Sequence, residues 1–127
     1  MFRLFPFAPL FTLTALLLNP CDSMAQETYY ISPTGHDAAS GTSANEAWQT
    51  INKLNQETFS PGDRILFERG GSWLGMFHLK GSGSQSQSIV IGAYGDADMP
   101  HPVLDGNGYQ AALLIYNDSF ITVENLA

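Results

Sequence analysis

The stretch Phe120-Ile-Thr-Val-Glu-Asn-Leu-Ala127 decides the fold class, because it repeats a β-type pattern already present in several earlier segments. Short runs of β-branched, aromatic and aliphatic residues begin near Thr28, and turns rich in Gly and Pro separate them. The last run reaches Ala127 without a turn or a polar tail. We therefore expect an all-β chain that forms the front part of a longer protein.

The spacing of the apolar runs indicates a repeat. Ile65 and Ile89 are 24 positions apart, and Ile91 and Ile115 are also 24 positions apart. A repeat of this length, made of several short strands, is typical of a stacked β-solenoid. An antiparallel sandwich with an N-terminal helix is the alternative that the pattern leaves open.

The region before these runs carries the features of a cap. Thr28-Tyr-Tyr-Ile31 predicts a first strand, and Ser43-Ala-Asn-Glu46 fits a capping box at the start of a helix. Trp48, Ile51 and Leu54 then form one apolar stripe at three-residue spacing. Because the end of a β-solenoid exposes strand edges and an open apolar core, we expect this strand and helix to cover it.

The first residues predict a secretory signal peptide. Arg3 precedes a mostly apolar run over residues 10–18, and small residues stand at both positions that a signal peptidase reads before a cleavage after Ala25. The run is too short for a membrane span. A lipid anchor on Cys21 is the alternative, although Pro20 stands where such sites have a small residue. We expect a secreted, periplasmic or cell-surface protein.

The composition of the remaining chain excludes several classes. It contains no cysteine, so no disulfide framework supports it. The net charge is −7, and the bases after the leader are scattered singly at Lys53, Arg64, Arg69 and Lys80. Nucleic-acid binding requires a basic stripe or patch, so we expect no nucleic-acid partner, and we expect no membrane span in the mature chain.

Five segments resemble the N-terminal cap and first coils of secreted right-handed parallel β-helix proteins of the pectate-lyase-like superfamily. They are Tyr29–Gly35, Ala47–Ile51, Pro61–Phe67, Ile89–Gly95 and Ser119–Leu126. The resemblance implies a right-handed parallel β-helix with a short N-terminal capping helix. We accordingly expect a signal peptide at 1–25, the first strand and capping helix at 26–62, and incomplete first coils at 63–127.

The same resemblance implies that the complete protein acts on polysaccharide. A lyase acting on acidic polysaccharide is expected ahead of a glycoside hydrolase, and a noncatalytic surface or carbohydrate-binding β-helix protein is the alternative. The superfamily's catalytic groups lie on later coils, so the resemblance assigns no catalytic residue here and implies that this chain alone is inactive.

Three residues are candidates for ligand binding. Trp73 follows Gly70-Gly71-Ser72 in an expected loop and could stack on a sugar ring, or it could pack on its own scaffold. Asp96 and Asp98 are a closely spaced carboxylate pair in a turn, which suits Ca²⁺ in a full-length lyase and also suits an ordinary turn. Asp105 and Glu124 could stack on adjacent coils as a hydrolase pair, but separate solvated positions are the simpler interpretation.

Overall fold

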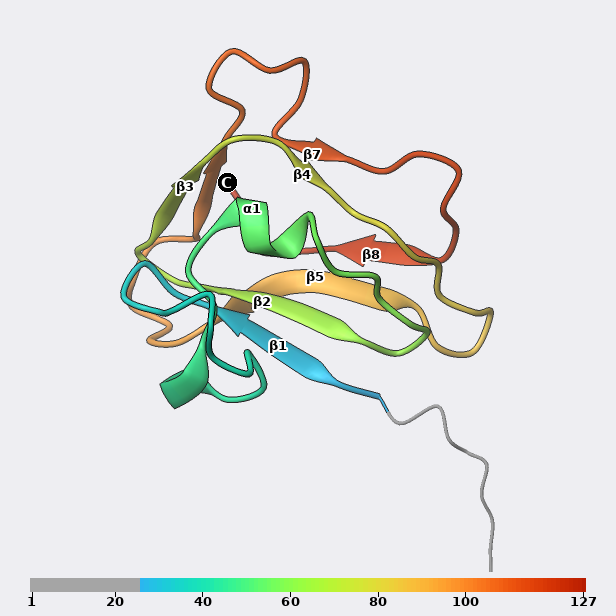
Figure 1. Cartoon of the computed structure of the whole chain (residues 1–127), viewed down its shortest axis with the longest axis horizontal. Coiled ribbons are helices and arrows are strands. Elements are labelled where there is room, and N and C mark those ends of the chain that lie inside the picture. The colour runs from blue at the N-terminus through green and yellow to red at the C-terminus, as the bar shows by residue number, and fades with distance from the viewer. Residues whose placement is uncertain (1–25) are drawn as a thin grey trace, which may run out of the picture.

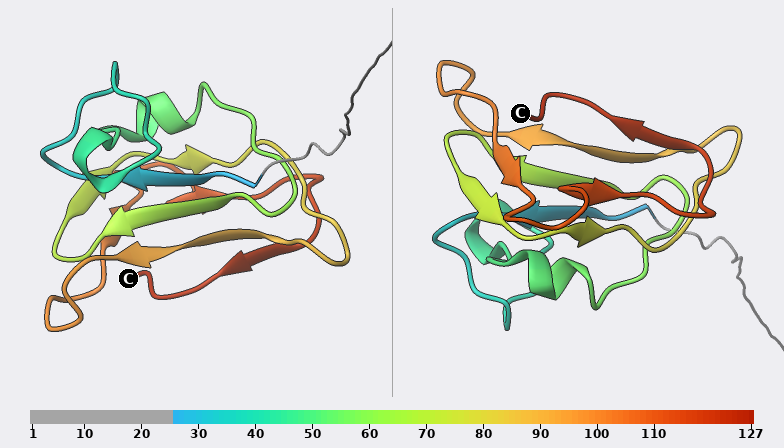
Figure 2. Two further views of the ribbon diagram at one scale, coloured as in Figure 1. Left: turned by 90° about the horizontal axis from the view of Figure 1, so that it is seen from below. Right: turned by 90° about the horizontal axis from the view of Figure 1, so that it is seen from above.

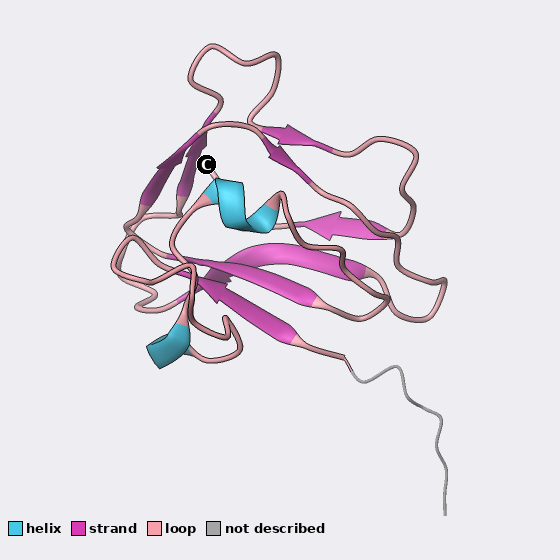
Figure 3. Ribbon diagram, in the orientation of Figure 1, coloured by secondary structure: helices cyan, strands magenta, loops and turns pink. Residues whose placement is uncertain are grey.

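Eight short strands wind through residues 26–127, the part of the chain that the computed structural model describes (Figure 1). They are β1 (Thr28–Ile31), β2 (Arg64–Glu68), β3 (Ser72–Leu74), β4 (Phe77–His78), β5 (Ile89–Tyr94), β6 (Val103–Asp105), β7 (Leu113–Leu114) and β8 (Ile121–Val123). Helical residues are few (Figure 3): a 3-10 turn, η3 (Ala44–Glu46), and the single-turn helix α1 (Ile51–Leu54). The predicted signal peptide, residues 1–25, lies outside the described residues.

The strands form three parallel sheets that wrap around one core. The largest sheet has the order β1-β2-β5-β8, and two-stranded sheets pair β3 with β6 and β4 with β7. The chain visits the three sheets in turn, and Figure 2 shows successive coils stacked along one axis with β1 at the N-terminal end. The predicted fold class, an all-β parallel β-helix with a short N-terminal capping helix, is confirmed.

The register of the stack differs from the predicted repeat. Ile65 pairs with Ile91 rather than with Ile89, and Ile89 pairs with Ile121. Further round the coil, Phe77 pairs with Leu113, so the offset between paired strands ranges from 26 positions (65 to 91) to 36 (77 to 113). The predicted spacing of 24 is wrong because loops of different length separate strands that nevertheless stay in register.

The cap contains the expected elements, but the helix begins later than predicted. Ser43 makes no side-chain capping bond, and the Glu46 carboxylate instead accepts a hydrogen bond from the Ser40 hydroxyl at 2.7 Å. The N-cap of α1 is Thr50, whose hydroxyl accepts from the backbone N–H of Lys53 at 3.1 Å. The capping box at Ser43 is therefore a wrong prediction: the chain leaves the 3-10 turn in extended conformation before the helix starts.

Trp48 closes the cap from this extended segment and not from the helix. Its backbone makes a parallel β-bridge to Ile31. Its indole ring stacks on Tyr29 with centroids 5.0 Å apart, and its N–H donates to the carbonyl of Ala39 at 2.8 Å. The outer edge of β1 is thus partly covered, as expected for the end of a solenoid.

The core lies inside the coils and is aromatic in its first coil. The ring of Phe67 contacts Trp73 and Phe77 edge to face, with centroids 5.0 and 6.3 Å apart. The aliphatic members of the buried cluster come from the large sheet, the cap and the segment after β4: Ile31, Ile51, Leu54, Ile65, Leu79, Ile89 and Ile91.

Candidate functional site

The structure places Trp73 on β3, not in the loop that its glycine-rich context predicted. The residue is 5% exposed, its ring packs on Phe67, and the indole N–H donates to the carbonyl of Gln49 at 2.9 Å. A ring covered in this way offers little face to a sugar. This position favours the scaffold role, which the sequence left open. Trp73 also forms part of the wall of a neighbouring cavity.

Two cavities flank Leu74, the residue that follows Trp73, and together they form a groove between α1 and β3. Ile51 of α1 and Leu74 line both cavities, whose volumes are about 270 and 410 Å³. The smaller cavity is lined by Ile51, Asn52, Asn55, Leu74, Gly75, Met76 and Tyr109. The larger one is lined by Pro33, Gln49, Thr50, Ile51, Ser72, Trp73 and Leu74. We call this feature the cap groove.

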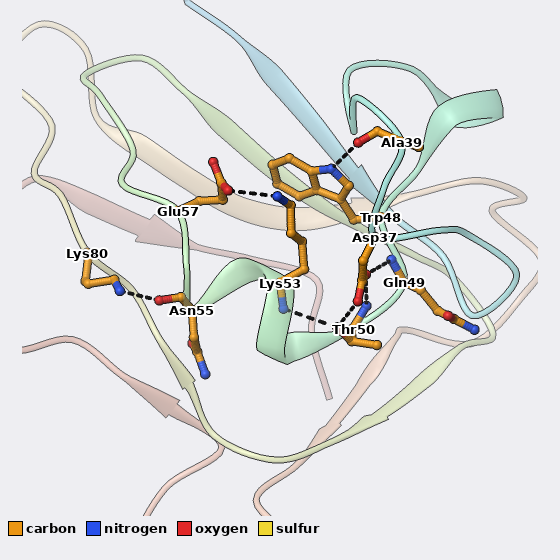
Figure 4. A network of polar contacts seen from close by, with 9 residues as sticks. All are labelled: Asp37, Ala39, Trp48, Gln49, Thr50, Lys53, Asn55, Glu57 and Lys80. Carbon is orange, nitrogen blue, oxygen red and sulfur yellow. Dashed lines mark hydrogen bonds and ion pairs between the residues drawn. The ribbon is translucent and has the colours of Figure 1, made fainter.

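The α1 wall of the cap groove is held by Asp37, as Figure 4 shows. One oxygen of this carboxylate accepts from the backbone N–H groups of Gln49 and Thr50 at 2.9 and 3.0 Å, and the other accepts from the Thr50 hydroxyl at 2.6 Å. Burial opposes ionisation of Asp37, but these hydrogen bonds hold its pKa below the ordinary value of 3.8. The carboxylate therefore fixes the start of α1.

Asp37→Asn should lower stability in a pH-dependent way. The folded pKa is depressed, so the carboxylate contributes its stability above the ordinary pKa and loses it as pH falls through the folded pKa. We expect the variant to be less stable near neutral pH by about 1–2 kcal/mol, because a neutral amide accepts these hydrogen bonds less strongly than an ionised carboxylate does. Urea unfolding of both proteins at several pH values checks this. A stability difference that stayed constant down to about pH 3 would contradict it.

The far end of α1 is tied to β4 through Asn55. Its amide nitrogen donates to the carbonyl of Met76 at 3.0 Å, and its amide oxygen accepts from the backbone N–H of His78 at 2.8 Å. The Lys80 ammonium donates to the Asn55 carbonyl. On the same helix, Lys53 pairs with Glu57 at 3.0 Å and lies over the Trp48 ring (Figure 4). These bonds make the cap groove a preformed feature.

The predicted Ca²⁺ ligands Asp96 and Asp98 lie in an exposed turn after β5. One Asp96 carboxylate oxygen accepts from the backbone N–H of Asp98 at 2.9 Å, which is the bond of an Asx turn. Residues 26–127 contain no group of three or more His, Cys, Asp or Glu side chains placed to hold a metal. Two carboxylates supply at most four of the six to eight oxygens that Ca²⁺ takes, and Asp96 already bonds within the turn, so the geometry supports the turn role.

Asp105 and Glu124, the carboxyls considered as a hydrolase pair, belong to different parts of the coil. Asp105 ends β6, and its carboxylate accepts from the backbone N–H of Asn107 at 2.9 Å. Glu124 follows β8, and its side chain lies beside Gly92 of the large sheet. Each side chain thus has a neighbour of its own, the Asn107 N–H for Asp105 and Gly92 for Glu124.

A second cluster lies on the outer face of the large sheet. The rings of Tyr30 and Tyr94 meet edge to face with centroids 5.0 Å apart, and the Ser32 hydroxyl donates to the Glu68 carboxylate at 2.6 Å. Burial and then the charge of Glu68 raise the pKa of Tyr94 to about 12, although hydrogen bonding with Ser32 opposes the shift. A phenol with this pKa stays neutral near pH 7.

No motif or spacing in the sequence indicated the cap groove. Leu74, Asn52 and Tyr109 are brought together by the packing of α1 on the first coil and by the loop after β6. No spacing rule connects these three positions, so only the folded arrangement reveals them.

No family model matches the chain. It is 34% identical over 126 aligned residues to a lacto-N-biosidase of Bifidobacterium longum subsp. longum; the alignment covers 78% of this chain and 8% of that protein. Crystal structures of a GH136 lacto-N-biosidase from Eubacterium ramulus superpose with a TM-score of 0.71 and 30% identity, covering 79% of this chain and 20% of theirs.

A rhamnogalacturonan lyase also superposes, with a TM-score of 0.60 and 18% identity, over 79% of this chain and 28% of the other. At that identity the likeness concerns the fold alone. The chain thus spans less than a tenth of the length of the curated relative and about a fifth of the lacto-N-biosidase structures, and it shares the β-helix fold over that part.

Proposed function

We propose that this chain forms the cap and first coils of a carbohydrate-active β-helix protein that hydrolyses glycosidic bonds. The observation that carries the proposal is the similarity to lacto-N-biosidases: 34% sequence identity over 78% of this chain to one, and a TM-score of 0.71 with 30% sequence identity over 79% of this chain to another. The sequence alone favoured a lyase. We place hydrolysis first, because the rhamnogalacturonan lyase superposes at only 18% identity, where the likeness concerns the fold alone.

The proposal assigns binding, and no catalytic residue, to residues 26–127. Glycoside hydrolysis needs two carboxyls about 5–9 Å apart across the scissile bond. Of the pair considered from the sequence, Asp105 accepts from the backbone N–H of Asn107, and Glu124 follows β8 and lies beside Gly92. We therefore propose that this chain alone is inactive and contributes the rigid end of the solenoid.

Export is part of the proposal. We propose that residues 1–25 are a cleaved signal peptide, that the mature protein is secreted or lies at the cell surface, and that it belongs to the pectate-lyase-like superfamily. None of the helices in residues 26–127 has the length and apolarity that crossing a membrane requires. Mass spectrometry of the protein recovered from a secreting host should find an N-terminus at Gln26, and retention of Met1 would contradict this part.

The test of the activity uses the protein encoded by the complete gene, with the 127-residue chain measured in parallel. We expect the complete protein to release lacto-N-biose from a chromogenic lacto-N-bioside, and the chain alone to release none. A product with the ultraviolet absorbance of an unsaturated uronate, formed from an acidic polysaccharide, would restore the lyase assignment. Binding of carbohydrate without cleavage of either substrate would favour the noncatalytic alternative.

A further inference from the structure

We infer that the cap groove is a binding site for an uncharged oligosaccharide, with Leu74 and Tyr109 as its apolar contacts. The inference rests on the proposed function, because it names the chemical class of sugar that the first coil would take.

The size and rigidity of the cap groove suit a small ligand. Its two cavities, about 270 and 410 Å³, meet at Leu74 and lie near the range of 300–1,000 Å³ that small-molecule pockets occupy. Both walls are fixed by hydrogen bonds that are complete without a ligand: Asp37 to the start of α1, Asn55 to β4 and Trp73 to Gln49. A preformed site of this kind binds without a large ordering cost.

The β3 side of the groove offers unpaired backbone groups. Among the described residues, β3 pairs on one side only, with β6. In a parallel pair the backbone groups of successive residues point to alternate edges, and the N–H of Gly75 and the C=O of Gly71 already bond to β6. The N–H and C=O groups of Ser72 and Leu74 therefore point toward the opposite edge, where both residues line the groove. Sugar hydroxyls are suitable partners for such groups, because they both donate and accept.

The lining of the groove favours a neutral sugar over a uronate. Within the described part of the chain, the residues that line the two cavities carry no charged side chain. Their polar members are amides and hydroxyls, such as Asn52, Gln49 and Ser72. A carboxylate placed there would lose hydration without a cationic partner, which is costly. The uncharged lining is thus a second reason, independent of the similar proteins, to favour a neutral glycan over an acidic polysaccharide as the ligand.

Leu74 and Tyr109 supply the apolar contact that the faces of a sugar ring require. They are 64% and 62% exposed, and they lie on the same cavity. Tyr109 is carried by the loop between β6 and β7, where its N–H donates to the carbonyl of Gly106 at 2.8 Å. An aromatic ring beside an open strand edge combines a stacking surface with a hydrogen-bonding rim.

A peptide strand added to the edge of β3 is the competing occupant. The edge is only three residues long, Ser72–Leu74. Strands of globular proteins usually have about five to six residues, so this edge would hold an added strand weakly. The observations therefore favour the oligosaccharide.

The experiment measures binding of lacto-N-biose, cellobiose and trigalacturonate to the folded 127-residue chain by NMR titration. We expect the neutral disaccharides to bind and trigalacturonate not to bind. Tyr109→Ala and Leu74→Ala should each weaken neutral binding about tenfold, because each removes an apolar contact from an exposed position. The matched control is Tyr116→Ala, which removes a tyrosine of similar exposure, 58%, that does not line the groove. Circular dichroism of each variant verifies that it is folded.

Three results would overturn the inference: no neutral binding by the folded chain, equal binding of trigalacturonate, or a loss in Tyr116→Ala as large as in Tyr109→Ala. The same variants in the protein encoded by the complete gene separate this inference from the proposed function. If the complete protein hydrolyses the lacto-N-bioside and the groove variants bind sugar as well as the unchanged protein, the proposed function holds and the groove is not the binding site. If sugar binds in the groove and no hydrolysis is detected, the inference holds and the proposed function is wrong.

Discussion

Phe67→Ala should destabilise the chain by about 3–5 kcal/mol, the usual cost of removing a large aromatic side chain from a core. Phe67 is fully buried on β2, and its ring contacts both Trp73 and Phe77. The substitution leaves a cavity at the point where the three sheets of the first coil meet. Domains are typically stable by only about 5–15 kcal/mol, so the variant should unfold at much lower urea concentration or fail to accumulate.

The control for Phe67→Ala is Phe120→Ala. Phe120 is 52% exposed and lies outside the core, so its truncation should change the free energy of unfolding by no more than about 0.5 kcal/mol. Urea unfolding followed by circular dichroism measures both variants. Equal losses for the two phenylalanines would contradict the assignment of Phe67 to the centre of the core.

Gly81→Ala should cost about 3 kcal/mol or more, because two effects act at this position. Gly81 has a φ of +127°, a conformation that residues with a side chain rarely adopt. A Cβ there would also lie 2.1 Å from the carbonyl oxygen of Phe59, which is backbone and cannot rotate away. The N–H of Phe59 donates to the carbonyl of Lys80 at 2.9 Å, so the clash would separate the cap from the first coil.

Gly108→Ala isolates the first of these effects. Gly108 also has a positive φ, +86°, but nothing lies within 4 Å of the Cβ position. Its substitution should cost only about 1 kcal/mol, the price of the left-handed backbone alone. Thermal and urea unfolding of the two variants compare them directly. If Gly81→Ala were no more destabilising than Gly108→Ala, the close approach of the cap to the first coil would be refuted.

Much of the fold could be predicted because each strand carries its own local signal. Thr28–Ile31, for example, is a strand with the predicted bounds. Strand β3 escaped prediction. It has three residues between Gly71 and Gly75, too few for an alternating pattern to stand out.

The register and the candidate site could not be predicted, because both depend on distant parts of the chain. The pairing of Ile65 with Ile91 depends on how far the intervening loops travel, and loop length is not encoded in the apolar pattern. The cap groove likewise unites α1, β3 and Tyr109, which no common motif links. The candidates chosen from local pattern, Trp73 and the Asp96–Asp98 pair, have structural partners of their own.

The unequal coil lengths have an evolutionary consequence. Since strands of the large sheet stay in register while the segments between them vary in length, insertions at the corners leave the stack intact. The loop between β6 and β7, which carries Tyr109 to the cap groove, is such a corner. Recombination or slippage at this one loop could therefore diversify ligand preference among descendants of a single scaffold, and directed evolution could begin with a library at the same place.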